Sequence, residues 1–258
     1  MILSGACGLL FIWKIEEVKI MNHNTRIAIC CYNGDQHQVI KALDNYLQHG
    51  CPVVVLSPGD APAEIRYPGI ENRFAGKRAY IGQESLDRQR EHLKLLLTFP
   101  EQFFLVHDAD SVCLSANISG YLYEEPDVLW SNLVIDTIPE HVVAYPPGFP
   151  NVAFQPPYFL SRKTIEALLA TAEGIQANPV MPFIDHYMVQ LAVKAGWPYK
   201  GFPDGASCST DPSLPCGIEI LGKLVREQGF VFMHSIKRRE VLDQLLRDRH
   251  AYITRDRS

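Results

Sequence analysis

Short apolar runs alternate with helical patterns in the first part of the chain. Residues 26–32 and 53–56 are apolar runs of strand length, and each is followed by a turn signal rich in Asn, Asp, Gly, Ser or Pro. Between them, apolar residues recur at helical spacing before Gly50, at Val39, Ile40, Leu43 and Leu47. A strand, a helix and a second strand in this order predict a parallel crossover.

The same patterns place the remaining elements. A helix is predicted over residues 85–98, and a buried strand over 103–106 follows Pro100. Further strands are predicted at 128–130, 133–135 and 230–233, and further helices at about 161–172, 182–195 and 235–250. Stretches rich in Pro, Gly or Ser are predicted to be loops, at 58–80, 145–157 and 203–217. The last of these is a candidate lid. Strands interleaved with helices favour an α/β fold with no forced division into two domains.

Composition narrows the class of protein. Of 258 residues, 47% are apolar and 21% are charged, which are globular values. A net charge of −5 without a basic block disfavours a nucleic-acid partner. Seven cysteines without a Cys-x-x-Cys pair favour a reducing compartment, and we expect a cytoplasmic protein.

The N-terminal segment is the only part that raises the question of a membrane. Residues 2–13 are apolar, but a span across a bilayer takes about 20 residues, so no transmembrane span is expected. We predict that residues 1–24 are a weakly structured extension. Weak contact of residues 1–20 with a membrane surface is the alternative.

The candidate chemistry follows the strand predicted over residues 103–106. Asp108 and Asp110 are separated by the small Ala109. In an extended backbone alternate side chains share a face, so the two carboxylates repel unless a cation lies beside them. Such oxygen ligands suit Mg²⁺ or Mn²⁺, and open α/β sheets bind ligands at the carboxyl ends of strands. The alternative is that both are solvated turn residues.

This arrangement resembles the GT-A family of metal-dependent glycosyltransferases. The similarity rests on Leu105-Val106-His107-Asp108-Ala109-Asp110 after a strand–helix–strand half, and on His234 at the end of a late strand, with Lys237 nearby. It covers about residues 25–240. It implies a single Rossmann-like domain over 25–258, with a mixed, mostly parallel central sheet flanked by helices. The nucleotide half would span about 25–112 and the acceptor half about 113–240.

For the donor, the resemblance implies a nucleotide diphosphate sugar, with a UDP-sugar favoured, whose diphosphate is bridged by Mn²⁺ or Mg²⁺. Asp110 would bind the metal, and Asp108 both the metal and the ribose. His234 would be the third ligand, as a neutral imidazole. The physical logic does not depend on the family, because a diphosphate leaves more readily when a metal neutralises its growing charge.

The resemblance also implies further donor contacts. Tyr32 would stack on the base and Asn33 would bond to its edge. Asp87, Arg88 and Arg90 would reach the ribose and phosphates, and Lys237 would contact a phosphate. A packed turn tyrosine and a solvated helix face explain all of these except Lys237 equally well.

For the acceptor, a hydroxyl of a glycan, lipid or protein, the candidate base is Asp185. It falls in the first turn of the helix predicted over 182–195, where the helix dipole favours a carboxylate. In inverting members of the family a carboxylate near this point removes the acceptor proton. His186 is the second candidate, and a retaining enzyme needs neither. The plain alternative is an acidic residue that stabilises a helix N-terminus.

Other functions remain open. An Asp-x-Asp motif also follows a strand in haloacid-dehalogenase-type phosphatases, but near the start of the fold, whereas two strands precede it here. A nucleotidyltransferase expects a Gly-rich, basic signature after the first strand, which Asn33-Gly34-Asp35 does not supply. A catalytically silent module that binds nucleotides or glycans is the alternative from another class.

Overall fold

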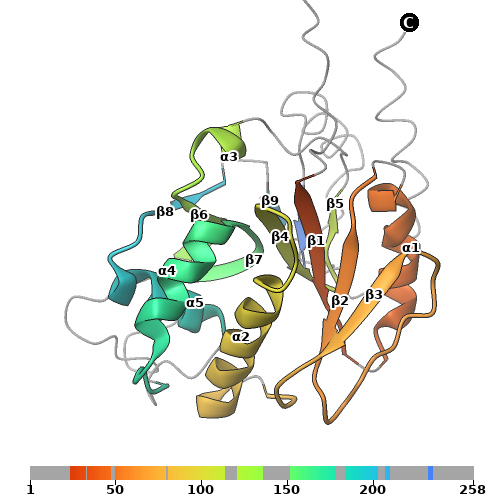
Figure 1. Ribbon diagram of the computed structural model, residues 1–258, viewed down its shortest axis with the longest axis horizontal. Helices are drawn as coiled ribbons and strands as arrows, with labels where there is room; N and C mark the ends of the chain where they lie inside the picture. Colours follow the sequence, from red (N-terminus) through yellow and green to blue (C-terminus); the bar gives the residue numbers. More distant parts are fainter. Residues whose placement is uncertain are drawn as a thin grey trace, which may run out of the picture.

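A seven-stranded mixed sheet forms the centre of the protein (Figure 1). The computed structural model describes residues 24–32, 34–47, 50–79, 81–113, 121–135, 152–177, 184–202, 207–209 and 232–234. The first elements are β1 (Thr25–Cys30), α1 (Gln36–Leu47), β2 (Val53–Ser57), β3 (Ile70–Phe74), α2 (Gly82–Leu96), β4 (Phe103–Asp108) and β5 (Val112–Cys113). They are followed by α3 (Tyr121–Glu124), β6 (Leu129–Ile135), β7 (Val152–Ser161), α4 (Arg162–Ala172), α5 (Ile184–Ala195), β8 (Tyr199–Gly201), β9 (Ser207–Ser209) and β10 (Phe232–His234).

The order of strands in the large sheet is β3-β2-β1-β4-β7-β6-β8. β1 runs parallel to both neighbours, with Ile27 beside Val53 of β2 and beside Leu105 of β4. β7 is antiparallel to β4 and to β6, while β8 is parallel to β6. Within this sheet β7 is therefore the one strand that is antiparallel to the rest. The prediction of an α/β fold with a mixed, mostly parallel sheet is confirmed.

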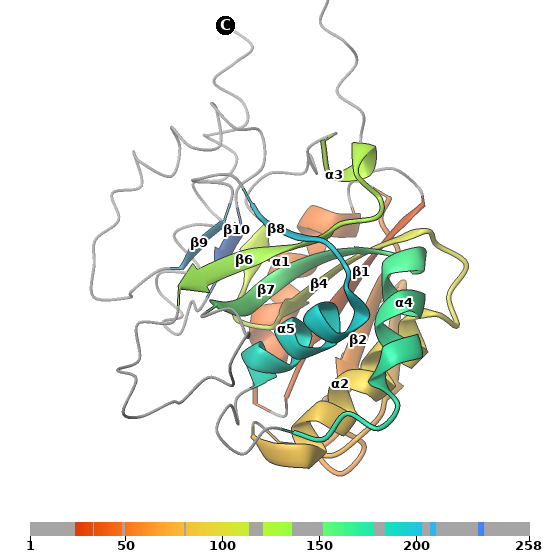
Figure 2. The same ribbon diagram turned by 90° about the vertical axis from the view of Figure 1, so that its left-hand side faces the viewer.

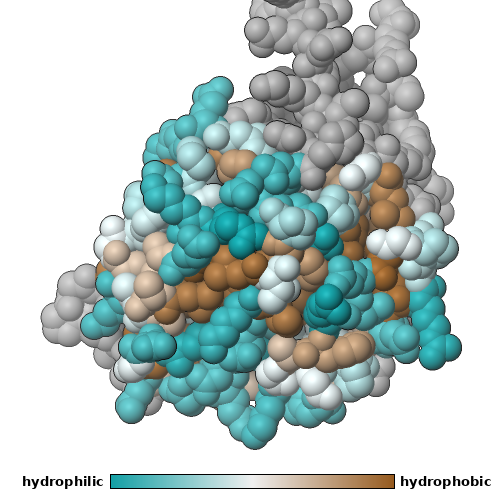
Figure 3. Space-filling model, in the orientation of Figure 1, coloured by the Kyte–Doolittle hydropathy of each residue, from teal (hydrophilic) through white to brown (hydrophobic). Residues whose placement is uncertain are grey.

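Apolar side chains fill both faces of the sheet. Because successive residues of a strand point to opposite faces, Ile27, Ile29 and Leu105 pack toward α1. Ala28 and Val106 pack on the other face, toward α2, α4 and α5. Figure 2 shows these three helices in front of the sheet and α1 behind it. On the outer face of the helices, Figure 3 shows hydrophilic residues interspersed with apolar patches.

α2 and α4 satisfy carbonyl groups at each other's C-terminal ends. The Arg90 guanidinium of α2 donates to the carbonyls of Ala172 and Ile175, at and beyond the end of α4. The Arg162 guanidinium of α4 donates to the carbonyl of Leu97, 3.0 Å away, directly after α2. The last carbonyls of a helix lack partners within it, and cations interact favourably with that end. These reciprocal bonds fix α2 against α4.

Two predicted loops contain strands. β3 lies inside residues 58–80, where its sequence Ile-Glu-Asn-Arg-Phe gives no apolar alternation because the strand is at the sheet edge and only partly buried. β7 begins inside 145–157. Gln155 pairs with Asn132 and Tyr158 pairs with Ser131, so the two prolines between them lie in a bulge. A bulge requires no N–H from them, which is why a strand accommodates them.

The late part of the chain is described only in short segments. Ser207–Ser209, inside the candidate lid, form a strand that pairs with β10, so this part is not a loop. β10 confirms a strand near residues 230–233. The helix predicted over 235–250 and residues 1–23 lie outside the described residues. None of the helices in the described ranges has the length and apolar composition needed to cross a membrane.

Candidate functional site

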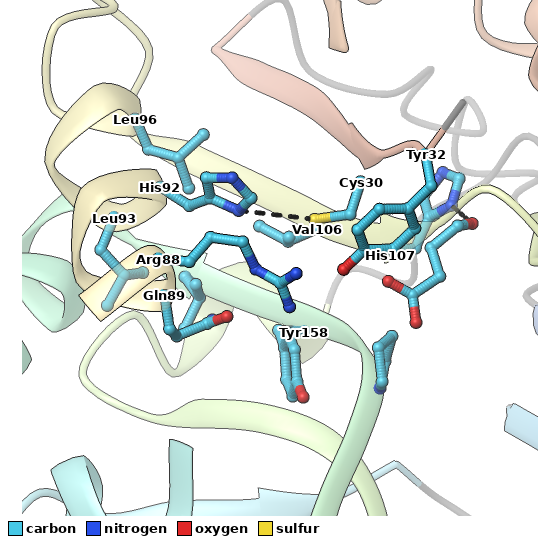
Figure 4. Close-up of a pocket in the computed structure, with 13 residues that line it drawn as sticks. Cys30, Tyr32, Arg88, Gln89, His92, Leu93, Leu96, Val106, His107 and Tyr158 are labelled. Carbon is cyan, nitrogen blue, oxygen red and sulfur yellow. Dashed lines mark hydrogen bonds between the residues drawn. The ribbon is translucent and has the colours of Figure 1, made fainter. Parts of the chain in front are cut away.

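A small pocket lies where the carboxyl ends of β1 and β4 meet. The chain leaves β1 for β2 and β3 on one side, whereas β4 lies on the other side of β1, so the strand order reverses between β1 and β4. This is the position at which open α/β sheets bind ligands. The pocket measures about 90 Å³, and its wall includes Cys30, Tyr32, Arg88, Asp108 and Tyr158 (Figure 4).

Arg88 is the unusual side chain of this pocket. It extends from α2 toward Tyr32 and Tyr158 (Figure 4) and is only 1% exposed. Within the described part of the chain its Nε and Nη1 have no hydrogen-bond partner. A buried guanidinium with unmade hydrogen bonds destabilises a fold, so it requires an explanation such as a ligand. The chemistry of the pocket therefore favours an anion that accepts hydrogen bonds from Arg88.

The loop after β3 holds Arg88 in place through Gly76. This glycine has a φ of +68°, and the Gly59 N–H donates to its carbonyl at 2.9 Å. A Cβ at residue 76 would lie 2.9 Å from both Cα and Cγ of Arg88. Contacts that short essentially do not occur, so only glycine allows the loop to pack directly on α2 at Arg88.

Gly76→Ala is therefore expected to displace Arg88, lower the melting temperature and weaken the binding of UDP with Mn²⁺ that the resemblance to GT-A enzymes implies. Gly69→Ala is the matched control, because Gly69 has a φ of +81° but a Cβ added there would meet no atom within 4 Å. Both variants carry backbone strain of about 1–3 kcal/mol, and only the first meets Arg88. Thermal unfolding and titration calorimetry measure the two effects. Equal UDP affinity in the two variants would show that Gly76 does not position Arg88.

Tyr32 lies close to two arginines at the pocket. Its ring centre is 5.3 Å from Cζ of Arg88 and 5.6 Å from Cζ of Arg78, both within cation–π range. For Tyr32 to stack on a base as predicted, the exposed Arg78 side chain would have to move away from the face of the ring. Asn33, the other predicted base contact, lies outside the described residues.

The thiol and one imidazole of the pocket are both held neutral. Cys30 Sγ is 3.9 Å from Nδ1 of His92. Burial, followed by the charge of Asp108, raises the pKa of Cys30 to about 12. Burial, followed by the charge of Arg88, lowers the pKa of His92 to about 3. At neutral pH the pair is a thiol and an uncharged imidazole, so it is not an activated thiolate nucleophile.

The acidic turn begins at the end of β4. Asp108 follows Val106 on the same side of the strand, is half-buried and lines the pocket. The Ala109 N–H still donates to the Cys30 carbonyl at 2.9 Å, but the Ser111 N–H donates to the Asp108 carbonyl at 3.0 Å. The chain therefore turns after Ala109. Asp108 and Asp110 were expected to share one face of an extended strand. The strand ends at Asp108, and Asp110 lies in the turn that follows.

A second sheet of three strands, in the order β5-β10-β9, brings the backbone of His234 near this turn. β10 runs antiparallel to β5, with Met233 opposite Val112. Continuing the register by one residue puts His234 opposite Ser111, directly after Asp110. The side chain of His234 and all of Lys237 lie outside the described residues.

The donor chemistry of the acidic turn fits a hard divalent cation. Asp108 and Asp110 offer the carboxylate oxygens that Mg²⁺ and Mn²⁺ prefer. The described side chains contain no group of three or more His, Cys, Asp or Glu gathered as metal ligands. Because the His234 imidazole is outside them, the complete set of Asp108, Asp110 and His234 stays a prediction.

The first turn of α5 lies at the same edge of the sheet. α2 leads into β4, so the N-terminus of α2 lies near the carboxyl end of β4. The Tyr187 hydroxyl of α5 donates to the Gly82 carbonyl of α2 at 2.8 Å. Asp185 and His186 directly precede Tyr187 on α5, so their backbone lies beside the start of α2. Their side chains are not described, and their roles stay predictions.

Asp87 lies on the outer face of α2, away from the pocket. Its side chain is 54% exposed, and its Oδ1 accepts hydrogen bonds from Gln83 Nε2 at 2.9 Å and from Arg90 Nη1 at 3.0 Å. It is not part of the pocket wall. The solvated helix face therefore explains Asp87 better than the predicted contact with ribose.

Sequence reasoning gave no site role to Gly76, which packs on Arg88, or to several residues of the pocket wall, namely Cys30, His92, His107 and Tyr158. A histidine inside an apolar strand is a signal that was available for His107, because a buried imidazole needs hydrogen-bond partners. The chain matches no model of a known protein family and no curated protein. The chemistry of the site is therefore argued from its geometry.

Proposed function

We propose that the protein is a metal-dependent glycosyltransferase of the GT-A type. It transfers a sugar from a nucleotide diphosphate sugar, with a UDP-sugar favoured, to a hydroxyl acceptor. The observation that carries this proposal is the Asp108 carboxylate and the buried, unsatisfied Arg88 guanidinium in one pocket at the point of strand reversal. A carboxylate that can hold a cation beside a guanidinium that can bind an oxyanion suits a metal–diphosphate ligand.

The fold supports the proposal at a coarser level. The acidic turn follows β4 at the carboxyl edge of a mixed sheet, as the resemblance to GT-A enzymes implies. The backbone of His234, more than a hundred residues later, is brought beside that turn by the pairing of β10 with β5. The start of α5, with Asp185, is bonded to the start of α2. Three segments predicted to act together therefore lie at one edge.

The size of the pocket indicates which part of the donor it takes. A volume of about 90 Å³ is well below that of sites for whole drug-sized ligands, which measure roughly 300–1,000 Å³. It suits a single phosphate group or part of a sugar ring. The rest of the donor would extend past Tyr32 and the acidic turn.

In the proposed reaction Asp108, Asp110 and His234 would hold Mn²⁺ or Mg²⁺, and the ion would supply neutralisation of the charge on the leaving diphosphate. Arg88 donates to a phosphate oxygen and gains the partner that it lacks. The acceptor oxygen bonds to the anomeric carbon while the bond from that carbon to the diphosphate breaks. Asp185 takes the acceptor proton if the reaction inverts, and His186 is the alternative base. A retaining reaction requires neither.

Asp110→Ala is expected to abolish the Mn²⁺-dependent binding of UDP and to leave thermal unfolding nearly unchanged, because the residue is half-buried in a turn. Titration of UDP with and without Mn²⁺ measures the first effect. Asp87→Ala is the control, since it removes an exposed carboxylate outside the pocket. Normal UDP–Mn²⁺ affinity in Asp110→Ala would refute the metal assignment.

Turnover separates the proposed enzyme from a silent binding module. Wild-type protein with Mn²⁺ should slowly release UDP from a UDP-sugar without an acceptor. Binding without any release would indicate a nucleotide-binding module. Neither binding nor release across UDP- and GDP-sugars would remove the transferase proposal.

A further inference from the structure

A chain of buried hydrogen bonds runs from α1 to the acidic turn. Tyr46, near the end of α1, is 0% exposed, and its hydroxyl is 2.8 Å from Nε2 of His107. His107 is 1% exposed, and its Nδ1 is 2.8 Å from the carbonyl oxygen of Asp108. The Tyr46 hydroxyl, the His107 imidazole and the Asp108 carbonyl are thus joined in series from α1 through β4 to the turn.

The direction of each hydrogen bond follows from the chemistry of the groups. A carbonyl oxygen only accepts, so the proton of the His107 ring lies on Nδ1. In the neutral imidazole Nε2 then accepts, and the Tyr46 hydroxyl donates to it. The Asp108 carbonyl therefore selects the tautomer, and the Tyr46 hydroxyl, which can donate or accept, satisfies the other ring nitrogen.

The Asp108 carbonyl is the point where the strand becomes the turn. It also accepts from the Ser111 N–H at 3.0 Å, the bond that closes the turn containing Asp110. Alternation along β4 directs the His107 ring toward Tyr46 of α1 and the Asp108 side chain toward α2, and both residues contribute to the pocket wall. A donor that holds this carbonyl on one face therefore fixes the peptide from which the Asp108 carboxylate projects on the other.

The residues packed around the Tyr46–His107 hydrogen bond are apolar, so packing at this position could be achieved without polar groups. Tyr46 belongs to an apolar cluster with Ile29, Leu43 and Leu105. Replacing a buried polar pair by apolar residues of similar volume is often neutral or stabilising. A role in orienting the turn is therefore a better explanation than a contribution to stability.

We propose that Tyr46 and His107 are positioning residues that set the geometry of the metal-binding turn, an inference that rests on the proposed function. His107 also lies in the wall of the pocket, but its imidazole bonds to the Tyr46 hydroxyl and the Asp108 carbonyl. The two residues act through the backbone of Asp108, as residues behind a metal ligand orient it.

Two substitutions of His107 separate positioning from packing. The side-chain amide of asparagine reaches about the place of Nδ1, so His107→Asn keeps a donor for the Asp108 carbonyl and loses the contact with Tyr46. The longer glutamine reaches about the place of Nε2, so His107→Gln keeps a contact with Tyr46 and leaves the carbonyl without that donor. Tyr46→Phe removes only the hydroxyl.

The measurement is titration of Mn²⁺ into the protein with saturating UDP, alongside thermal unfolding of each variant. His107→Gln is expected to weaken Mn²⁺ binding by about ten- to a hundredfold, the usual effect of losing a group that orients a metal ligand. His107→Asn should bind within a few-fold of the wild type although it unfolds at a similarly lowered temperature. Affinities that follow stability, with Asn and Gln alike, would overturn the positioning role.

The controls distinguish failure of this inference from failure of the proposed function. If the wild type binds Mn²⁺–UDP and His107→Gln binds it equally well, only the positioning role is lost. If the wild type does not bind at all, the proposed function and the inference resting on it both fail. Should His107→Gln not fold, Tyr46→Phe is decisive: a several-fold loss of Mn²⁺ affinity supports positioning, and wild-type affinity contradicts it.

Discussion

Arg88→Met is expected to make the protein more stable and to abolish the proposed binding of UDP with Mn²⁺. Arg88 is 1% exposed and its Nε and Nη1 have no hydrogen-bond partner in the described structure, so the fold buries two unsatisfied donors. An apolar side chain of similar length removes that penalty, which is about 1–3 kcal/mol for a buried group without its hydrogen bond. Urea unfolding and UDP–Mn²⁺ titration measure the two opposite changes.

Arg90→Met is the matched control on the same helix. Arg90 donates to the carbonyls of Ala172 and Ile175 and lies outside the candidate site, so its loss should lower stability and leave UDP affinity unchanged. Arg88→Lys keeps the charge without the two-pronged donor and should bind UDP with intermediate affinity. A less stable Arg88→Met protein that still binds UDP normally would contradict the assignment of Arg88.

The opposite signs expected for the two arginines reflect a trade between stability and function. Sites prepared for a ligand hold charges that the empty fold does not satisfy, and the ligand satisfies them on binding. His92 and Cys30 remain neutral beside Arg88, since the pKa of His92 is lowered to about 3 and that of Cys30 is raised to about 12. Neither of these two groups therefore adds charge of its own to the pocket.

The sequence predicted the centre of the fold well because β1, β2 and β4 are buried on both faces and read as continuous apolar runs. The edge strand β3 was missed, since a half-exposed strand keeps no such run. The start of β7 was predicted to be a loop because of its prolines. Only the pairing of β7 with β6 shows that two of these prolines lie in a bulge. Pairing between distant segments cannot be read from local pattern.

In the candidate site, too, local pattern predicted some residues, whereas others depend on packing between distant segments. Asp108 was predicted because two acids directly follow an apolar run. Arg88 was predicted to be a donor contact, but its unmade hydrogen bonds could not be predicted. Arg88 and Arg90 are chemically alike and lie two positions apart on one helix. A helix turns about 200° over two residues, so one guanidinium enters the pocket and the other reaches α4. The Tyr46–His107 contact joins residues 61 positions apart and depends on how α1 packs on the sheet.

Asp185→Asn is expected to slow sugar transfer by about 10²–10⁴ and to leave UDP–Mn²⁺ affinity unchanged, if the reaction inverts the anomeric centre. Asp185 lies one residue after the start of α5, whose Tyr187 is bonded to Gly82 at the start of α2. The substitution is nearly isosteric and removes a charge from the first turn of a helix, which costs about 0.3–1 kcal/mol in stability. The rate with saturating donor and acceptor, compared with the donor Kd, isolates the chemical step.

His186→Gln tests the neighbouring candidate, and the pair of variants gives a result for each mechanism. A large loss of rate in Asp185→Asn alone identifies the carboxylate as the base, because the imidazole is intact in that variant. A loss in His186→Gln alone transfers the role to the imidazole. Similar rates in both variants contradict an inverting reaction with a base on α5, and the anomeric configuration of the product, determined by NMR, then separates a retaining reaction from an inverting one whose base lies elsewhere.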